Sequence, residues 1–300
     1  MKALAALFLT TVLWAQSAPT VKLEREFERL ATLSPGTLGV SVIHLESGRQ
    51  VSFRGGTRFP MASAYKVAIS YELLRRVDAG DDKLERMVTL APEDFHPGSG
   101  TLTALFNPPG VDQPGVSLSL RHLLELMILI SDNSATDILL REVGGSVAVN
   151  KHLAALGVTS VQVDGPTKEM IANWRTNGTG AEGQLRNTAA PDGMAALLAK
   201  IHRGEGLKPE SAKLFLDVLR RCQTGNARLK GLLPEGTVVL HKTGTLGGVA
   251  NDVGFIRLPG DAGTLAIAVF VKGADAATAE KRDRAIAEVA RAAHDYFLFQ

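Results

Sequence analysis

Strand-like segments lie near the two ends of this chain, and the long stretch between them has helical periodicity. Short runs rich in β-branched residues predict five strands, at 38–45, 51–54, 237–241, 252–258 and 265–271. Apolar residues at helical spacing predict helices at 23–33, 65–77, 118–130, 135–143, 147–156, 191–201, 212–221 and 276–297. Strands at both ends must pair with each other, so the helical middle is an insertion. The sequence therefore predicts an α+β fold: a five-stranded antiparallel sheet flanked by helices, with an inserted all-helical lobe.

Composition excludes several classes of protein. The chain has 33 Lys and Arg against 31 Asp and Glu, so no strong field attracts nucleic acid or lipid. The only cysteine is Cys222, which rules out an intramolecular disulfide and an all-cysteine zinc site. The histidines include no His-x-x-x-His spacing. We therefore expect a monomer with no metal, no cofactor and no nucleic-acid partner.

The first residues have the pattern of an export signal. Lys2 precedes an apolar run at 3–14, and the small residues Ala15, Ser17 and Ala18 follow. This pattern predicts a signal peptide at 1–17 and export to the periplasm or the exterior, with no membrane segment afterwards. The mature part, 18–300, is expected to form one catalytic domain, with a sheet lobe at about 20–60 and 212–300 and a helical lobe at about 61–211.

The first motif with chemical content is Ser63-Ala64-Tyr65-Lys66. On a helix, positions i and i+3 lie on one face about 5–6 Å apart. The amine of Lys66 is therefore expected near the hydroxyl of Ser63, where a desolvated lysine can remove the serine proton. Free N–H groups at the start of the helix could stabilise an oxyanion. A Ser-x-x-Lys match is common by chance, and a helix-capping serine is the structural alternative.

The second motif is Ser131-Asp132-Asn133, directly after the apolar run 123–130. Burying each unsatisfied polar group there would cost about 1–3 kcal/mol, so a loop that lines a cleft is expected. A hydroxyl in such a loop could relay a proton, and Asn133 could orient a substrate amide or the lysine. The alternative is a helix break in which Ser131 or Asp132 caps the next helix.

The third motif is Lys242-Thr243-Gly244-Thr245, at the end of the strand predicted for 237–241. A lysine and hydroxyl groups beyond an edge strand can bind a carboxylate. Gly244 allows another chain to approach the strand backbone. An ordinary solvent-facing strand end is the alternative for this motif taken alone.

The three motifs occur in the order that is typical of class A β-lactamases and penicillin-binding proteins. Over about 23–297 the sequence resembles class A serine β-lactamases. The segment 133–140 with the following Gly144-Gly145 is similar to the family's helix after the second motif, and 224–234 is similar to its segment before Lys-Thr-Gly. Asp137, where many members have Asn, resembles the subgroup of PER-type extended-spectrum enzymes.

The resemblance implies roles in acylation. Ser63 would be the nucleophile that opens a β-lactam or attacks a D-alanyl peptide, and Lys66 its general base. Ser131 would pass the proton to the leaving nitrogen, helped by Lys242. The backbone N–H groups of Ser63 and Thr245 would form the oxyanion hole.

The resemblance also implies how the substrate carboxylate is held. Thr243 and Thr245 would bind it. Members without an arginine on the strand after Lys-Thr-Gly often have one upstream; here Ala250 occupies the strand position, so Arg228 is the candidate. A surface arginine is the alternative.

The sequence departs from the family at the residue that activates the hydrolytic water. Class A enzymes have a glutamate about 34 residues beyond the motif asparagine, and counting from Asn133 gives Thr167. Glu169 stands two residues later, and Glu169 to Asn173 reproduces the family's Glu-to-Asn spacing. Glu169 is therefore the catalytic candidate. The segment 165–187 is longer than the family's usual loop, so both registers stay open, and a solvated carboxylate in a polar loop is the alternative for Glu169.

The register decides between functions. With Glu169 at the water, the protein is a β-lactamase that turns over and confers antibiotic resistance. Without a glutamate at the water, the protein resembles the class-A-like penicillin-binding proteins. Such a protein would form an acyl-enzyme, release it slowly, and could process D-alanyl peptides. A covalent β-lactam sensor is a third alternative, disfavoured because no signalling domain is visible in the sequence. We expect the β-lactamase.

Overall fold

The computed structural model describes residues 18–95, 100–106, 115–177, 186–275 and 278–299. The predicted signal peptide, 1–17, lies outside these residues. The helices are α1 (Ala18–Leu33), η1 (Ala62–Tyr65), α2 (Lys66–Ala79), η2 (Pro92–Asp94), α3 (Leu102–Phe106), α4 (Leu120–Leu129), α5 (Asn133–Glu142), α6 (Gly145–Ala155), α7 (Thr167–Asn177), α8 (Pro191–His202), α9 (Pro209–Arg220) and α10 (Ala279–Leu298), where η denotes a 3-10 helix. The strands are β1 (Thr37–His44), β2 (Gln50–Phe53), β3 (Phe59–Pro60), β4 (Met87–Thr89), β5 (Ser117–Ser119), β6 (Val161–Gln162), β7 (Thr188–Ala189), β8 (Val239–Leu246), β9 (Val249–Arg257) and β10 (Thr264–Lys272).

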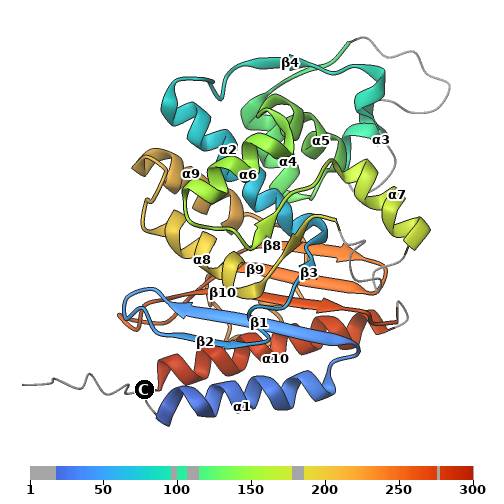
Figure 1. Ribbon diagram of the computed structural model, residues 1–300. Coiled ribbons are helices and arrows are strands. Elements are labelled where there is room, and N and C mark those ends of the chain that lie inside the picture. Colours follow the sequence, from blue (N-terminus) through green and yellow to red (C-terminus); the bar gives the residue numbers. More distant parts are fainter. Residues whose placement is uncertain (1–17, 96–99, 107–114, 178–185, 276–277, 300) are drawn as a thin grey trace, which may run out of the picture.

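The main sheet has five antiparallel strands in the order β2-β1-β10-β9-β8 (Figure 1). Its centre joins the two ends of the chain, because β1 pairs with β10 from Thr37↔Lys272 to His44↔Leu265. The five-stranded antiparallel sheet predicted from the sequence is confirmed. The strand β8, which carries the Lys-Thr-Gly motif, is the edge strand beside the helical part of the molecule.

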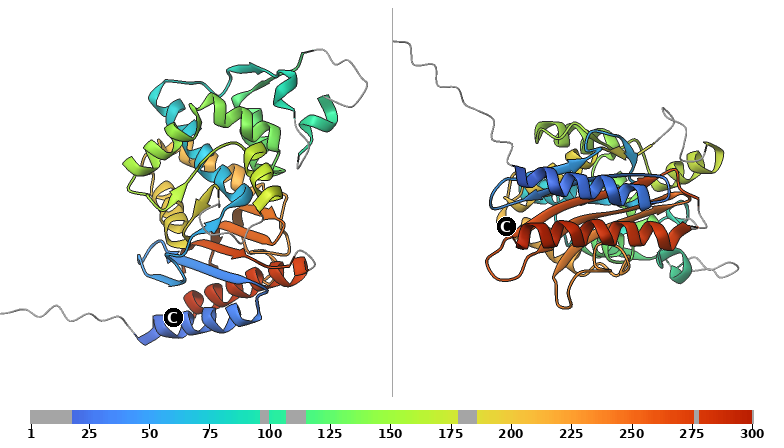
Figure 2. Two further views of the ribbon diagram at one scale, coloured as in Figure 1. Left: turned by 45° about the vertical axis from the view of Figure 1, so that its right-hand side comes forward. Right: turned by 90° about the horizontal axis from the view of Figure 1, so that it is seen from below.

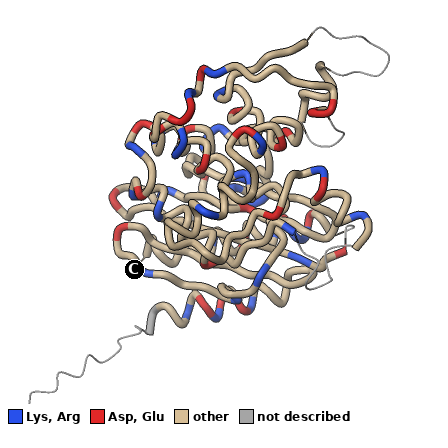
Figure 3. Tube along the Cα trace, turned by 45° about the horizontal axis from the view of Figure 1, so that its top comes forward, with Lys and Arg blue, Asp and Glu red and all other residues tan. Residues whose placement is uncertain are grey.

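One face of the sheet is covered by the first and last helices, which lie side by side in the view from below (Figure 2). Leu23, Phe27 and Leu30 of α1 are buried at helical spacing, and they pack with Ile286 and Val289 of α10 in one apolar cluster. Around the outside, cations and carboxylates are interspersed along the chain, as expected for a nearly neutral protein (Figure 3).

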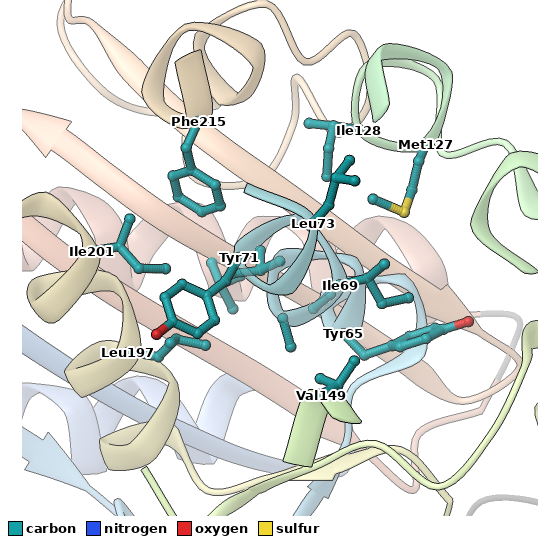
Figure 4. Packing of buried hydrophobic residues seen from close by; sticks show 14 of the residues in the cluster. Tyr65, Ile69, Tyr71, Leu73, Met127, Ile128, Val149, Leu197, Ile201 and Phe215 are labelled. Atoms are coloured by element: carbon teal, nitrogen blue, oxygen red, sulfur yellow. The ribbon is translucent and has the colours of Figure 1, made fainter. Parts of the chain in front are cut away.

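The other face of the sheet supports the helical part. Helix α8 packs on β1 and β10. Helix α2 is buried on all sides from Lys66 to Leu74, which is the pattern of a central core helix. Its Ile69 and Leu73 pack among side chains from several surrounding helices (Figure 4). In the part of the chain that the structure describes, no helix has both the length and the apolar composition needed to span a bilayer.

Two differences from the sequence prediction bear on the site. The stretch expected to be a polar loop contains α7, which begins at Thr167 because the Asp137 carboxylate accepts the N–H groups of Thr167 and Lys168 at 2.6 and 3.2 Å. Strand β8 continues to Leu246, five residues beyond the predicted end, because its ladder with β9 continues to the pair Leu246↔Val249. The Lys-Thr-Gly motif therefore lies inside a strand and has a fixed backbone.

Candidate active site

Ser63 lies in η1, the single turn that leads into the central helix α2. Its side chain is partly exposed, whereas Ala62 and Ala64 on either side are buried. Ala62 has a φ of +43°, a left-handed conformation that non-glycine residues rarely adopt. Such strain persists only where the surrounding structure enforces it. The fold thus holds Ser63, partly exposed, in a rigid turn.

Lys66 is completely buried and donates into the second motif. Its Nζ lies 2.7 Å from the carbonyl oxygen and 3.0 Å from Oγ of Ser131. It also lies 3.1 Å from Oδ1 of Asn133. Lys66 and Ser131 are 65 residues apart in the sequence. The Ser-x-x-Lys and Ser-Asp-Asn motifs therefore meet at the Lys66 amine.

The charge of Lys66 is disfavoured by its surroundings. Burial, and then the neighbouring Lys242 ammonium, hold the pKa of Lys66 well below its usual range, while the carboxylates of Asp132 and Asp137 act in the opposite direction. A buried amine with a lowered pKa can accept a proton near neutral pH.

The Ser-Asp-Asn segment is held by Asp132. Its Oδ1 caps α5 by accepting from the N–H of Ala135 at 2.8 Å, so the capping alternative for Asp132 describes part of its role. Its Oδ2 accepts from the N–H groups of Thr101 and Leu102 at 2.7 and 2.9 Å. Ser131, just before it, has a φ of +61°. The segment is fixed from both sides, with its serine in a strained conformation.

Strand β8 meets η1 at Gly244. A Cβ added to Gly244 would lie 2.2 Å from the Met61 carbonyl oxygen and 3.0 Å from the Ala64 nitrogen. Asn251 of β9 donates to the carbonyl oxygens of Pro60 and Met61, both at 2.8 Å. The chain that approaches Gly244 is therefore the backbone around Ser63, which brings the first and third motifs together.

Lys242 is also fully buried, and its Nζ donates to the carbonyl oxygen of Thr243 at 3.0 Å. Burial lowers the pKa of Lys242 to about 8, with Cys222 and Asp252 opposing the effect and Arg228 adding to it. The Thr243 hydroxyl lies 2.6 Å from that of Thr224. The site therefore contains two buried lysines, and the charge of Lys242 is near enough to lower the affinity of Lys66 for a proton.

Arg228 lies beneath the end of β8 with its side chain only 7% exposed. Its Nε donates to Asp283 at 2.8 Å, and its Nη1 donates to the carbonyl oxygens of Gly244 and Asn251 at 3.1 and 3.0 Å. Its Nη2 donates to Oγ1 of Thr245 at 2.8 Å. The surface-arginine alternative is excluded, because this guanidinium is buried and ties Thr245 to the sheet.

Glu169 lies apart from this group. Its side chain is 52% exposed, and its carboxylate pairs with Arg186 at 3.1 Å. It lines a cavity of about 360 Å³ whose lining, among the described residues, includes neither Ser63 nor Lys66. Thr167 is buried instead, and its hydroxyl lies 2.7 Å from that of Tyr65, two residues after Ser63.

Sequence reasoning missed two residues that shape the site. Asn251 holds the backbone before Ser63, and its only signal in the sequence was a polar residue directly before the strand predicted at 252–258. Tyr65 gave no signal, although burial and the Asp137 charge raise its pKa and leave its hydroxyl neutral. As for metals, the described residues contain no group of three or more His, Cys, Asp or Glu side chains that could hold an ion.

Comparison with known proteins agrees with this geometry. The model of the β-lactamase enzyme family matches residues 22–297. The extended-spectrum β-lactamase PER-1 of Pseudomonas aeruginosa is 31% identical over 289 residues, which cover 94% of this chain and 89% of that protein.

Two solved structures are also similar. A β-lactamase from Chitinophaga pinensis has a TM-score of 0.82 at 30% identity, covering 91% of this chain and 98% of that one. An acyl-enzyme complex of a PBP-A mutant with penicillin G has a TM-score of 0.79 at 29% identity, covering 92% and 96%. The chain belongs to the class A β-lactamase family, whose enzymes hydrolyse β-lactams.

Proposed function

We propose that this chain opens β-lactam rings through an acyl-enzyme formed on Ser63. The observation that carries the proposal is the buried Lys66 amine, which lies one helical turn from the partly exposed Ser63 and 3.0 Å from the Ser131 hydroxyl. The amine can accept a proton from Ser63 and donate one to Ser131. The similar PBP-A structure holds penicillin G as an acyl-enzyme.

The acylation steps follow from these positions. Lys66 takes the proton of the Ser63 hydroxyl, and Oγ attacks the lactam carbonyl carbon. The carbon–nitrogen bond breaks, and Ser131 delivers a proton to the ring nitrogen while Lys66 restores the proton of Ser131. The backbone N–H groups of Ser63 and Thr245 stabilise the oxyanion.

The substrate carboxylate binds at the β8 edge. Lys242 supplies the positive charge, and the hydroxyls of Thr243 and Thr245 donate hydrogen bonds. Gly244 admits the η1 backbone that carries Ser63. Asn133 orients both the substrate's side-chain amide and the Lys66 amine. Arg228 acts on the carboxylate through Thr245, whose hydroxyl oxygen accepts from the guanidinium and whose proton is left to point outward.

Breakdown of the acyl-enzyme is where a second candidate function enters. Glu169 was the candidate base for the hydrolytic water, but its carboxylate is half exposed and paired with Arg186. Thr167, at the family's glutamate position by count, is buried against Tyr65. These two placements support a second candidate function beside the β-lactamase: an enzyme that acylates rapidly and deacylates slowly, as a penicillin-binding D,D-peptidase would.

Acyl-enzyme lifetime separates the two functions. The experiment compares nitrocefin turnover with intact mass of the protein over time. Many turnovers per site with no lasting adduct support a β-lactamase, and one burst followed by a persistent adduct supports the peptidase-like function. In both cases Ser63→Ala should abolish labelling by a fluorescent penicillin, and retained labelling in that variant would refute the assignment of Ser63.

We further propose that residues 1–17 direct export and are removed, and that the mature monomer, 18–300, works in the periplasm or outside the cell. Class A enzymes are typically exported, and the near-neutral charge fits a protein without a nucleic-acid partner. N-terminal sequencing of the secreted protein and its mass in solution would test both statements. An intact N-terminus in the exported protein would contradict the first.

A further inference from the structure

The indole of Trp174 rests on the backbone of Gly247. A Cβ added to Gly247 would lie 2.2 Å from Cζ2 and 3.2 Å from Cη2 of the Trp174 ring, so the ring occupies the place of a side chain. Gly247 and Gly248 form the two-residue turn between the paired residues Leu246 and Val249. Trp174 thus covers the tip of the β8–β9 hairpin.

Helix α7 connects this tip to the helix that carries the nucleophile. Thr167, Met170 and Trp174 follow the i, i+3, i+7 pattern of one helix face. At one end of that face the Thr167 hydroxyl contacts Tyr65 of η1, and at the other Trp174 contacts Gly247. The ends are about 10 Å apart along the axis. In Figures 1 and 2, α7 lies above the end of the hairpin formed by β8 and β9.

The inference rests on the function proposed above. If a β-lactam binds as described there, the position of Trp174 limits where the substrate can extend. The carboxylate of the ring lies toward Lys242 and Thr243, and the reacting carbonyl lies at Ser63 beside Gly244. The acyl side chain projects from the other side of that carbonyl. It therefore runs along the rest of β8, toward Leu246 and Gly247, where Trp174 closes the path.

We propose that Trp174 is a specificity-determining residue that limits the size of the acyl side chain through its contact with Gly247. Compact acyl groups fit between Ser63 and the indole. Branched, bulky acyl groups fit only if the Trp174 indole moves away from Gly247. The role of Gly247 is to allow this contact, since any side chain there would occupy the position of the ring.

The test varies the acyl side chain on one bicyclic nucleus. Three probes are used: 6-aminopenicillanic acid, which has no acyl chain, a phenylacetyl penicillin, and a 2,6-dimethoxybenzoyl penicillin. Second-order acylation rates are measured from the absorbance change of ring opening with the enzyme in excess over the probe, so that the result does not depend on turnover. In Trp174→Ala the rate ratio of the dimethoxybenzoyl to the phenylacetyl probe should rise about tenfold, the order expected for one pocket-filling group. The rate with 6-aminopenicillanic acid should stay within about twofold.

A second variant removes the same contact by changing Gly247 in place of Trp174. Gly247→Ala should displace the indole and change the ratio in the same direction, and the double variant should not exceed Trp174→Ala, because both remove one contact. Gly56→Ala is the matched control, since a Cβ there meets nothing within 4 Å. An unchanged ratio in Trp174→Ala and Gly247→Ala would overturn the inference. Failure of all probes to acylate the unmodified protein would instead refute the proposed function.

Discussion

The Nη2 of Arg228 donates a hydrogen bond of 2.8 Å to the hydroxyl oxygen of Thr245. The same guanidinium binds the carbonyl oxygens of Gly244 and Asn251, on two neighbouring strands. An arginine identified as a possible carboxylate ligand is thus anchored against the sheet. Its effect on the substrate is expected to pass through the orientation of Thr245.

Arg228→Ala should therefore lower the acylation rate for a penicillin by about 10–100-fold, the scale of a charge-assisted hydrogen bond. Thr245→Val should lower it similarly, and the double variant should be no worse than Arg228→Ala. Arg291→Ala, which removes an exposed arginine, is the control. Fully additive losses would show that Arg228 contacts the carboxylate itself.

Acylation should decline on the alkaline side around pH 8. Burial lowers the pKa of Lys242 to about 8, so the ammonium that attracts the carboxylate loses its proton as the pH rises through that value. In Lys242→Arg the guanidinium stays charged, so the decline should move above about pH 10. Rates of acylation between pH 6 and about 10.5 would show this, and an identical profile in the two proteins would exclude Lys242 as the titrating group.

Gly244→Ala should disrupt the site from the β8 side. The new Cβ would meet the Met61 carbonyl oxygen at 2.2 Å and the Ala64 nitrogen at 3.0 Å, and these backbone atoms flank Ser63. We expect a loss of about 1–3 kcal/mol in unfolding free energy, typical of overpacking, and a loss of acylation far larger than that of Gly56→Ala. Denaturant unfolding and penicillin labelling measure the two effects. Normal labelling of Gly244→Ala would mean that η1 tolerates displacement.

Glu169→Gln should leave the acyl-enzyme lifetime within about twofold of the unmodified protein, because a half-exposed carboxylate paired with Arg186 is not at the reacting atoms. Thr167→Glu should shorten that lifetime by about a hundredfold or more, the scale of a positioned general base. Intact mass after a penicillin pulse measures both. A trapped adduct in Glu169→Gln would restore Glu169 as the base.

The five-stranded sheet and the three motifs could be predicted from local sequence. The strands near both ends and the helices between them could be predicted because each segment has its own side-chain periodicity. The motif residues Ser63 and Lys66 were visible because their spacing on one helix face is a local property. The sequence alone therefore determined the fold class and most of the candidate site.

The tertiary structure decided what depends on distant partners. Helix α7 was missed because its first turn is capped by Asp137, 30 residues earlier, while its own residues are mostly polar. Glu169 and Thr167 could not be separated by counting, since a helix rotates side chains two residues apart to different faces. Whether Arg228 is buried, and whether Trp174 lies on Gly247, depends on how the sheet and helices pack. Local sequence carries periodicity and motif spacing, but burial and contact across the chain exist only once the elements have packed together.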